Sequence, residues 1–140
     1  MPPKQLHPDS LALTLLLTLL VSFGPLSVDL YVPSMPEVAQ MMQTRSGEIQ
    51  FTISLYLMGF AVGQIVCGPI SDRYGRKPAI LCSFALYCLG SLLCLSAHSL
   101  EMLVAGRIVQ GFGVSGSVVA TRAMVRDMYE GARASLQFST

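Results

Sequence analysis

The sequence predicts an all-α integral membrane protein built as a bundle of four transmembrane helices. Of its 140 residues, 52% are hydrophobic and only 12% are charged, whereas a soluble domain carries about 25% charged residues. Its mean hydropathy is +0.57. The chain contains four apolar runs near the roughly 20 residues that a helix needs to cross a bilayer; they lie at residues 11–30, 49–70, 78–97 and 102–125.

Composition argues against several other classes of protein. The net charge of +1 gives no indication of a nucleic-acid partner. No nucleophile–base set is apparent, so we do not expect an enzyme, and we expect no cofactor. The four cysteines all lie in apolar runs without a Cys-x-x-Cys pair, so we expect small buried side chains and no metal site; they are Cys67, Cys82, Cys88 and Cys94.

The first apolar run, residues 11–30, follows a polar tail at residues 1–10. We expect a retained span and not a cleaved signal peptide, because the run is long and no small-x-small cleavage site follows it. Five of its residues, four of them polar and one a proline, fall within about 80° of one another at 3.6 residues per turn; they are Thr14, Thr18, Ser22, Pro25 and Asp29.

The second apolar run is preceded by residues 31–48, which we expect to form a loop on the outer side of the membrane. This loop contains one basic residue, Arg45, and the run that follows it, residues 49–70, contains no charged residue. Within the run, Gly59 and Gly63 have the Gly-x-x-x-Gly spacing that lets two helices approach closely. We therefore expect a span that packs tightly against another helix.

The turn at residues 68–78, between the second and third spans, is the most strongly charged part of the chain. Cytoplasmic loops carry an excess of Lys and Arg, so we expect this turn in the cytoplasm. Gly75 can take a positive φ, which allows a very short connection, and we expect Gly68 and Pro69 to end the preceding helix. The charged residues of the turn are Asp72, Arg73, Arg76 and Lys77.

The remaining connections fit the same orientation. Residues 98–101 contain no Lys or Arg and are expected outside, whereas the end of the chain offers Arg122, Arg126 and Arg133 and is expected in the cytoplasm. The tail at residues 1–10 is then also cytoplasmic. The predicted topology therefore has four spans with both ends of the chain in the cytoplasm.

The fourth span, residues 102–125, contains Arg107 near its outer end. Asp29 lies near the outer end of the antiparallel first span, so the two charges are expected at comparable depth. A direct or water-mediated pair would lower the cost of burying both, and charges within spans are functional-site candidates. Two alternatives stay open: Asp29 is simply interfacial, or Arg107 snorkels to the outer surface. Arg107 shares a stripe of about 80° with Gln110, Val114, Ser117 and Thr121.

The glycines of the fourth span match a dinucleotide-binding pattern, Gly111-x-Gly113-x-x-Gly116. That pattern binds a dinucleotide only where a strand precedes it and a helix begins with it. Here it lies in the middle of an apolar span. We therefore interpret these glycines as small residues that permit close helix packing.

The charged turn carries a family resemblance. Gly68-x-x-x-Asp72-Arg73-x-Gly75-Arg76-Lys77 resembles the loop that joins helices 2 and 3 in the major facilitator superfamily. Arg107-Ile-Val-Gln110-Gly111-x-Gly113 is similar to the helix 4 signature of its proton-coupled exporters. The segments 29–36 and 126–129 resemble the Bcr/CflA-type drug-resistance branch, a group of drug:proton antiporters.

This resemblance implies an antiporter of the cytoplasmic membrane that exchanges protons for a drug or a similar small organic molecule. It implies that Asp29 and Arg107 take part in proton coupling, with Gln110 and Tyr31 in the same substrate cavity. It also implies that the charged turn acts as a conformational switch; its residues are Gly68, Asp72, Arg73, Gly75, Arg76 and Lys77.

Members of this family have about twelve spans in two halves of six helices, and this sequence provides the first four. We therefore expect part of a multidrug efflux transporter, with residues 126–140 leading to a fifth helix. Its expected partners are membrane lipid, the remaining helices of the transporter, protons and a small organic substrate. Two alternatives stay open: a non-transporting membrane subunit or remnant, and a small four-span exporter that dimerises.

Overall fold

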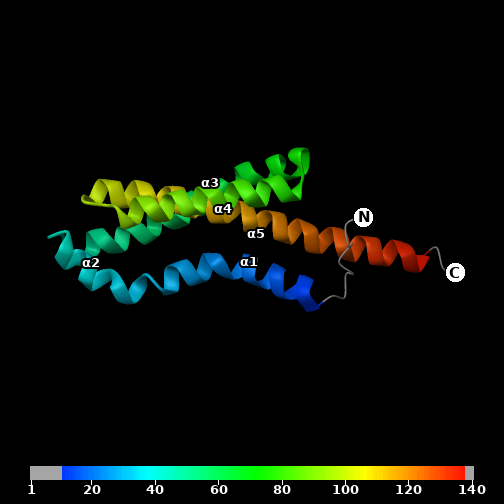
Figure 1. Cartoon of the computed structure of the whole chain (residues 1–140), viewed down its shortest axis with the longest axis horizontal. Coiled ribbons are helices and arrows are strands. Elements are labelled where there is room, and N and C mark those ends of the chain that lie inside the picture. Colours follow the sequence, from blue (N-terminus) through cyan, green and yellow to red (C-terminus); the bar gives the residue numbers. More distant parts are fainter. Residues whose placement is uncertain (1–10, 138–140) are drawn as a thin grey trace.

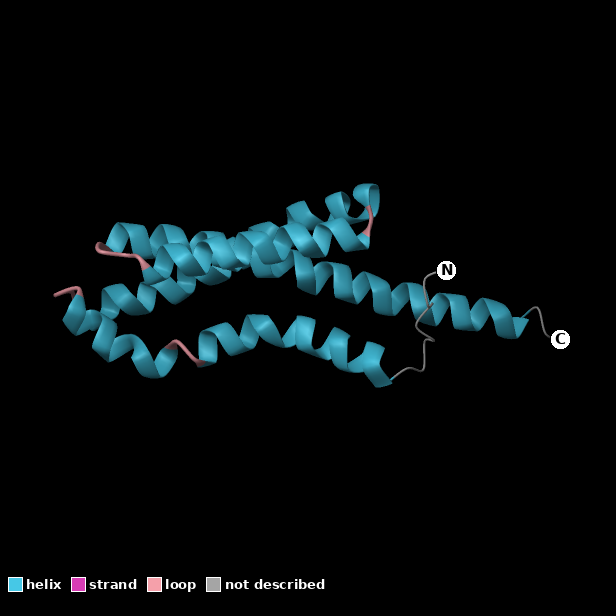
Figure 2. Ribbon diagram, in the orientation of Figure 1, coloured by secondary structure: helices cyan, strands magenta, loops and turns pink. Residues whose placement is uncertain are grey.

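The structure is a computed structural model that describes residues 11–137, so the predicted tail at residues 1–10 lies outside it. Every regular element in the described part is a helix (Figures 1 and 2). Four of the helices are long and apolar enough to cross a membrane, as the sequence predicts. The elements are α1 (Leu11–Asp29), the 3-10 turn η1 (Val32–Ser34), α2 (Met35–Met41), α3 (Ser46–Tyr74), α4 (Arg76–Leu95) and α5 (Leu100–Gln137).

Helix α5 is the centre of the bundle. In the apolar stretch of α5 that is long enough to cross a membrane, 61% of the residues are buried. The corresponding share is 17% in each of the other three membrane-length segments. It packs most extensively against α3 and α4 and less extensively against α1, which runs along another side of the bundle in Figure 1. Beyond the predicted end of the fourth span at residue 125, α5 continues as a helix to Gln137.

Glycines bring the helices together around α5. A methyl group at Gly59 would lie 2.5 Å from the carbonyl oxygen of Ile108, so α3 and α5 touch backbone to backbone there. The other glycines that the sequence assigned to helix packing meet a neighbouring helix equally closely; they are Gly63, Gly111, Gly113 and Gly116. Gly90 and Gly106 form the same kind of contact between α4 and α5, and the sequence analysis missed them.

The turn between α3 and α4 is a single residue, Gly75. Its φ of +96° confirms the expected positive value, and its N–H closes α3 by donating to the Ser71 carbonyl at 3.1 Å. The expectation that Gly68 and Pro69 end the preceding helix is wrong, because α3 continues through both of them. Pro69 lacks the N–H that would donate within the helix, yet α3 is continuous on both sides of it.

Because the turn is so short, the charged residues lie on helices and not in a loop. Asp72 and Arg73 belong to the last turn of α3, and Arg76 and Lys77 belong to the first turn of α4. This end of the bundle is called the Gly75 end below. Because these charged side chains project from helix ends and not from a flexible loop, they can pair with side chains of a third helix.

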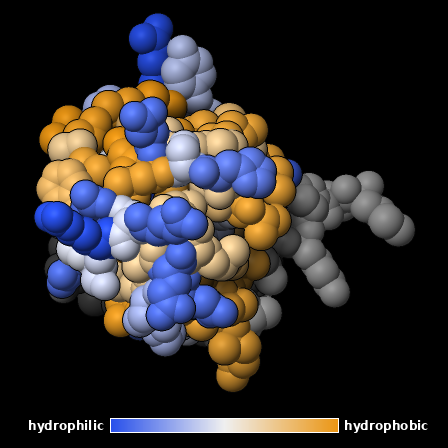
Figure 3. Space-filling view, turned by 90° about the vertical axis from the view of Figure 1, so that its left-hand side faces the viewer, coloured by the Kyte–Doolittle hydropathy of each residue, from blue (hydrophilic) through white to orange (hydrophobic). Residues whose placement is uncertain are grey.

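The opposite end of the bundle carries α2 and the connection between α4 and α5, and is called the α2 end. The expected loop at residues 31–48 contains η1 and α2, because apolar side chains of α2 pack onto a buried cluster of Tyr31, Ala39, Ile49 and Leu103. Seen end-on, hydrophilic residues gather on this face and apolar residues lie around its sides (Figure 3).

Candidate functional site

A buried arginine lies at the α2 end of the bundle. Arg107 of α5 is only 7% exposed, and its guanidinium carbon lies 3.4 Å from the centroid of the Tyr31 ring. Its terminal nitrogen donates a hydrogen bond of 3.0 Å to the Gln110 side-chain carbonyl, one helical turn further along. Three of the residues that the sequence placed in one candidate cavity therefore meet.

Hydrogen bonds extend this cluster to the neighbouring helices. The Gln110 amide donates to the Ser91 hydroxyl at 2.9 Å, and that hydroxyl donates to the Tyr87 carbonyl at the same distance. On the other side, the Tyr31 and Thr52 hydroxyls lie 3.0 Å apart. The cluster thus ties α5 to α3, to α4 and to the end of α1. The sequence analysis missed Ser91 and Thr52; their signal is a hydroxyl within an otherwise apolar span.

Asp29 does not belong to this cluster. It is the last residue of α1, its side chain is exposed, and it forms no ion pair with Arg107 among the described residues. The expected direct pair is therefore absent, because the guanidinium is held by the Tyr31 ring and by Gln110. Asp29 is nevertheless only two residues from Tyr31, so the two charges lie at the same end of the bundle, as the sequence predicts.

The two polar stripes that the sequence predicts face different surroundings. The α5 stripe from Arg107 to Thr121 is buried inside the bundle. The α1 stripe is exposed along its whole length. Two of its hydroxyls form hydrogen bonds within α1: Thr18 and Ser22 each donate to the backbone carbonyl four residues earlier at 2.8 Å. The α1 stripe therefore faces outward from the four helices and does not complement the α5 stripe.

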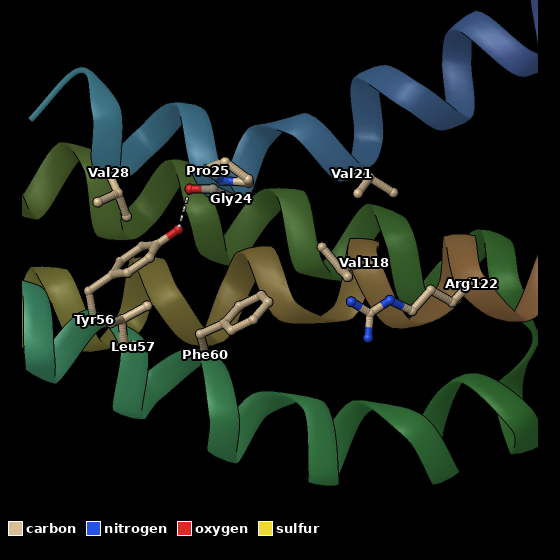
Figure 4. Close-up of a pocket in the computed structure, with 9 residues that line it drawn as sticks. All are labelled: Val21, Gly24, Pro25, Val28, Tyr56, Leu57, Phe60, Val118 and Arg122. Atoms are coloured by element: carbon tan, nitrogen blue, oxygen red, sulfur yellow. Dashed lines mark hydrogen bonds between the residues drawn. The ribbon is translucent and has the colours of Figure 1, made fainter.

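A pocket of about 310 Å³ lies between α1, α3 and α5 (Figure 4). Tyr56 lies at one end of it and donates a hydrogen bond of 3.2 Å to the Gly24 carbonyl, beside Pro25. Arg122 lies at the other end, on α5. The walls between them are apolar side chains from all three helices: Val21, Val28, Leu57, Phe60 and Val118.

A second charged group lies at the Gly75 end. Arg76 is its centre, with one terminal nitrogen 2.6 Å from Asp72 and 3.2 Å from the Ser71 hydroxyl, and the other 3.3 Å from Asp127 of α5. The sequence analysis did not assign Asp127 to a site. Arg73 lies over the Tyr74 ring at 5.7 Å, and Lys77 is exposed. The charged turn is thereby fastened to the central helix.

No group of three or more His, Cys, Asp or Glu side chains lies close enough to hold a metal ion within the described part of the chain. The candidate site consists instead of an arginine cluster at each end of the bundle and an apolar pocket between them. These features suit the binding of an organic molecule.

A family comparison decides what kind of bundle this is. The family model described as Major Facilitator Superfamily matches residues 15–139, nearly the whole chain. The chain belongs to the major facilitator superfamily. The predicted family and fold class are confirmed. Because the superfamily consists of transporters, the prediction that the chain is not an enzyme is confirmed as well.

Individual relatives include drug-resistance proteins. The chain is 41% identical to an uncharacterized MFS-type transporter of Bacillus subtilis over 94% of its length and 33% of the relative's. It is 36% identical to multidrug resistance protein D of Escherichia coli, covering 84% of the chain and 30% of the relative. It is 38% identical to a chloramphenicol resistance protein of Pseudomonas aeruginosa, covering 87% of the chain and 29% of the relative.

The chain thus spans about a third of the length of the curated relatives that it matches. No solved structure shows a significant match to it. As a member of this superfamily with four apolar helices, the chain is a multi-pass membrane protein.

Proposed function

We propose that this chain forms the first four helices of a transporter that exports small organic molecules in exchange for protons. The relatives named for multidrug and chloramphenicol resistance support the export of drug-like molecules. The membrane is the cytoplasmic membrane, with the Gly75 end toward the cytoplasm and the α2 end toward the outside. The basic residues at the Gly75 end support this orientation.

The pocket between α1, α3 and α5 carries the proposal. Its volume of about 310 Å³ lies at the lower end of the range of small-molecule sites, which are mostly apolar with a few polar groups at fixed positions. Tyr56 and Arg122 are those polar groups, at opposite ends of the pocket (Figure 4). An apolar drug lies between them, against Phe60 and Val118.

Filling the pocket tests its role in transport. In the transporter that contains this chain, Leu57→Trp should remove efflux of chloramphenicol from drug-loaded cells, because the larger ring occupies the drug's place. Val66→Trp is the matched control, since both residues are exposed on α3, at 51% and 41%, but only Leu57 lines the pocket. Equal efflux by the Leu57 variant and the parent would place the drug elsewhere.

Proton coupling is assigned to Asp29 and Arg107. A carboxylate at the end of α1 can exchange protons with water, and Arg107 lies at the same end of the bundle, stacked on Tyr31. In this proposal Arg107 leaves the Tyr31 ring and pairs with Asp29 in another state of the transport cycle. To form that pair Asp29 turns inward from its exposed position, and opposite charges attract more strongly as water is excluded from around them.

Two substitutions test this coupling. Asp29→Asn should abolish efflux driven by a proton gradient while the protein stays in the membrane. Arg107→Ala should shift the pH dependence of drug binding, because it removes the counter-charge. The measurement is drug binding against pH in both variants and the parent. If Asp29→Asn leaves that dependence unchanged, Asp29 is an interfacial residue with no part in coupling.

Two other functions compete with this proposal. A non-transporting membrane subunit would bind other helices through the exposed faces of α1 and α3, and a four-span exporter would dimerise. Translation of the DNA beyond the Thr140 codon distinguishes the proposals: further apolar spans in frame support the longer transporter. A stop codon directly after Thr140, together with a monomer in detergent, would favour the subunit.

A further inference from the structure

A second and larger cavity lies at the α2 end, apart from the apolar pocket. Its volume is about 550 Å³, and it lies between α2, α4 and α5. It shares no lining residue with the pocket of Figure 4. Its polar lining comes from Tyr31, Ser91, His98 and Arg107.

The charge in this cavity is positive and uncompensated. No aspartate or glutamate lines it, and Arg107 forms no ion pair with any described residue. A guanidinium offers five N–H donors and no acceptor. A buried charge without a partner is expensive, so intramembrane arginines pair with an anion or reach water.

The guanidinium has donors to spare. One terminal nitrogen donates to Gln110, and Nε has no hydrogen-bond partner among residues 11–127, although it is buried. Tyr31 covers the face of the guanidinium at 3.4 Å from the ring centroid. A guanidinium donates its hydrogen bonds in its own plane, so stacking on a ring leaves those directions free for a carboxylate.

The rest of the cavity is apolar. Met41 and Met42 come from α2 and its end, and Leu95 and Cys94 come from α4. Methionine side chains are flexible and adapt to the shape of a bound molecule. A cavity of this size, with one buried cation and apolar walls, has the composition of a site for a small amphiphilic molecule.

We propose that this cavity binds a small organic anion, with its carboxylate on Arg107 and its apolar body against Met41, Met42 and Leu95. This inference rests on the proposed transport function and names an acidic class of molecule that reaches the protein from the outer side. The bound carboxylate takes the position of a counter-ion that Asp29 does not occupy in this structure.

Cys94 provides a reporter that does not depend on transport. It lines the cavity and is half-buried, so a bound molecule should slow its reaction with N-ethylmaleimide. In lipid nanodiscs the protein carries Cys67→Ala, Cys82→Ala and Cys88→Ala, which leaves Cys94 as the one thiol within residues 1–140. Any cysteine of the transporter outside these residues is replaced by alanine as well. Benzoate is the probe, and benzamide is its neutral counterpart of nearly equal size.

We expect saturating benzoate to slow alkylation of Cys94 at least threefold and benzamide to leave it unchanged. If benzoate does not protect Cys94, the proposal is overturned. Equal protection by both compounds would show that the cavity binds apolar molecules whatever their charge, which also overturns it. Because this comparison uses the native Arg107, it stays decisive even if an Arg107 variant fails to fold.

A pair of arginine variants then locates the anion. Arg107→Gln should weaken benzoate protection at least tenfold, as loss of a hydrogen bond to a charged group does. Arg126→Gln is the matched control, since the Arg126 side chain is 64% exposed at the Gly75 end and lines neither cavity, and should bind benzoate like the parent. Protection that survives Arg107→Gln overturns the assignment. Benzoate binding with no drug efflux would contradict the proposed function and leave this site intact.

Discussion

The guanidinium of Arg107 lies on the ring of Tyr31, with 3.4 Å between its central carbon and the ring centroid. The same tyrosine places its hydroxyl 3.0 Å from the Thr52 hydroxyl of α3. Tyr31 lies two residues beyond the end of α1 and is only 8% exposed. One aromatic side chain therefore joins the end of α1 to α3 and holds the buried cation of α5.

Replacing Tyr31 separates the two contacts. Tyr31→Leu removes both the cation–π contact and the hydroxyl contact, and should lower the free energy of unfolding by about 3 kcal/mol, of which the cation–π contact accounts for about 2 kcal/mol. Tyr31→Phe keeps the ring and loses only the hydroxyl contact, for about 1 kcal/mol. Denaturant unfolding in detergent micelles measures both. Equal losses in the two variants would assign the energy to the hydroxyl.

The pair between Arg76 and Asp127 should contribute modestly and depend on salt. Its members lie 3.3 Å apart with side chains 24% and 51% exposed, so a double-mutant cycle of Arg76→Gln and Asp127→Asn should give about 0.5 kcal/mol of coupling in the free energy of unfolding. High salt should reduce that coupling. Arg73→Gln is the control, because Arg73 forms no ion pair with a described residue. Coupling that salt leaves unchanged would contradict this account.

Gly75 should not tolerate any side chain. Its φ of +96° and ψ of 161° lie in a region that is essentially restricted to glycine. Gly75→Ala should therefore cost about 1–3 kcal/mol of unfolding free energy. An added Cβ would meet nothing closer than 3.9 Å, so the cost comes from the backbone. Gly47→Ala is the control, at a site with open space and no positive φ; similar stability of the two variants would be the contrary result.

Two glycines of α3 should respond in opposite directions to alanine. At Gly59 a methyl group would lie 2.5 Å from the Ile108 carbonyl, and overpacking of this kind costs about 1–3 kcal/mol. At Gly68 nothing lies within 4 Å of the added atom, so alanine should gain up to about 1 kcal/mol of helix propensity. Thermal unfolding of both variants decides it, and a stabilised Gly59→Ala would show that α5 can move away.

The orientation in the membrane is tested by reporter fusions. Fusions after Arg45 and after His98 should report the outside, and a fusion after Lys77 should report the cytoplasm, because the basic residues of the Gly75 end stay inside. Replacing Arg73 and Lys77 by Gln should loosen this orientation. A cytoplasmic signal after His98 would reverse the proposed topology.

Hydropathy predicted the four long helices because length and apolar character alone decide whether a segment can cross a bilayer. Hydropathy placed the end of α3 and the start of α4 too far apart, because it assigned the charged residues to a loop. Asp72 instead lies in the last turn of α3, and Arg76 lies in the first turn of α4. Helix α2 was missed because the buried cluster that it packs on is completed by Leu103 of α5, which is distant in sequence.

The sequence predicted those parts of the candidate site in which both residues lie on the same helix. Helical spacing correctly grouped Arg107 with Gln110, because both belong to α5. It did not show which neighbour each polar face meets, so the pairing of Arg107 with Asp29 was expected in place of the stacking on Tyr31. Ser91 was missed for the same reason, since its hydrogen bond to Gln110 crosses from α4 to α5.

The central position of α5 has a consequence for biosynthesis. Helices α1, α3 and α4 are made first, yet they pack only sparingly on one another and find most of their contacts on α5. Until the ribosome has completed α5, the glycine-lined faces of α3 and α4 therefore remain open to lipid. The tertiary structure of this region forms late, in one step that waits for its last helix to be inserted.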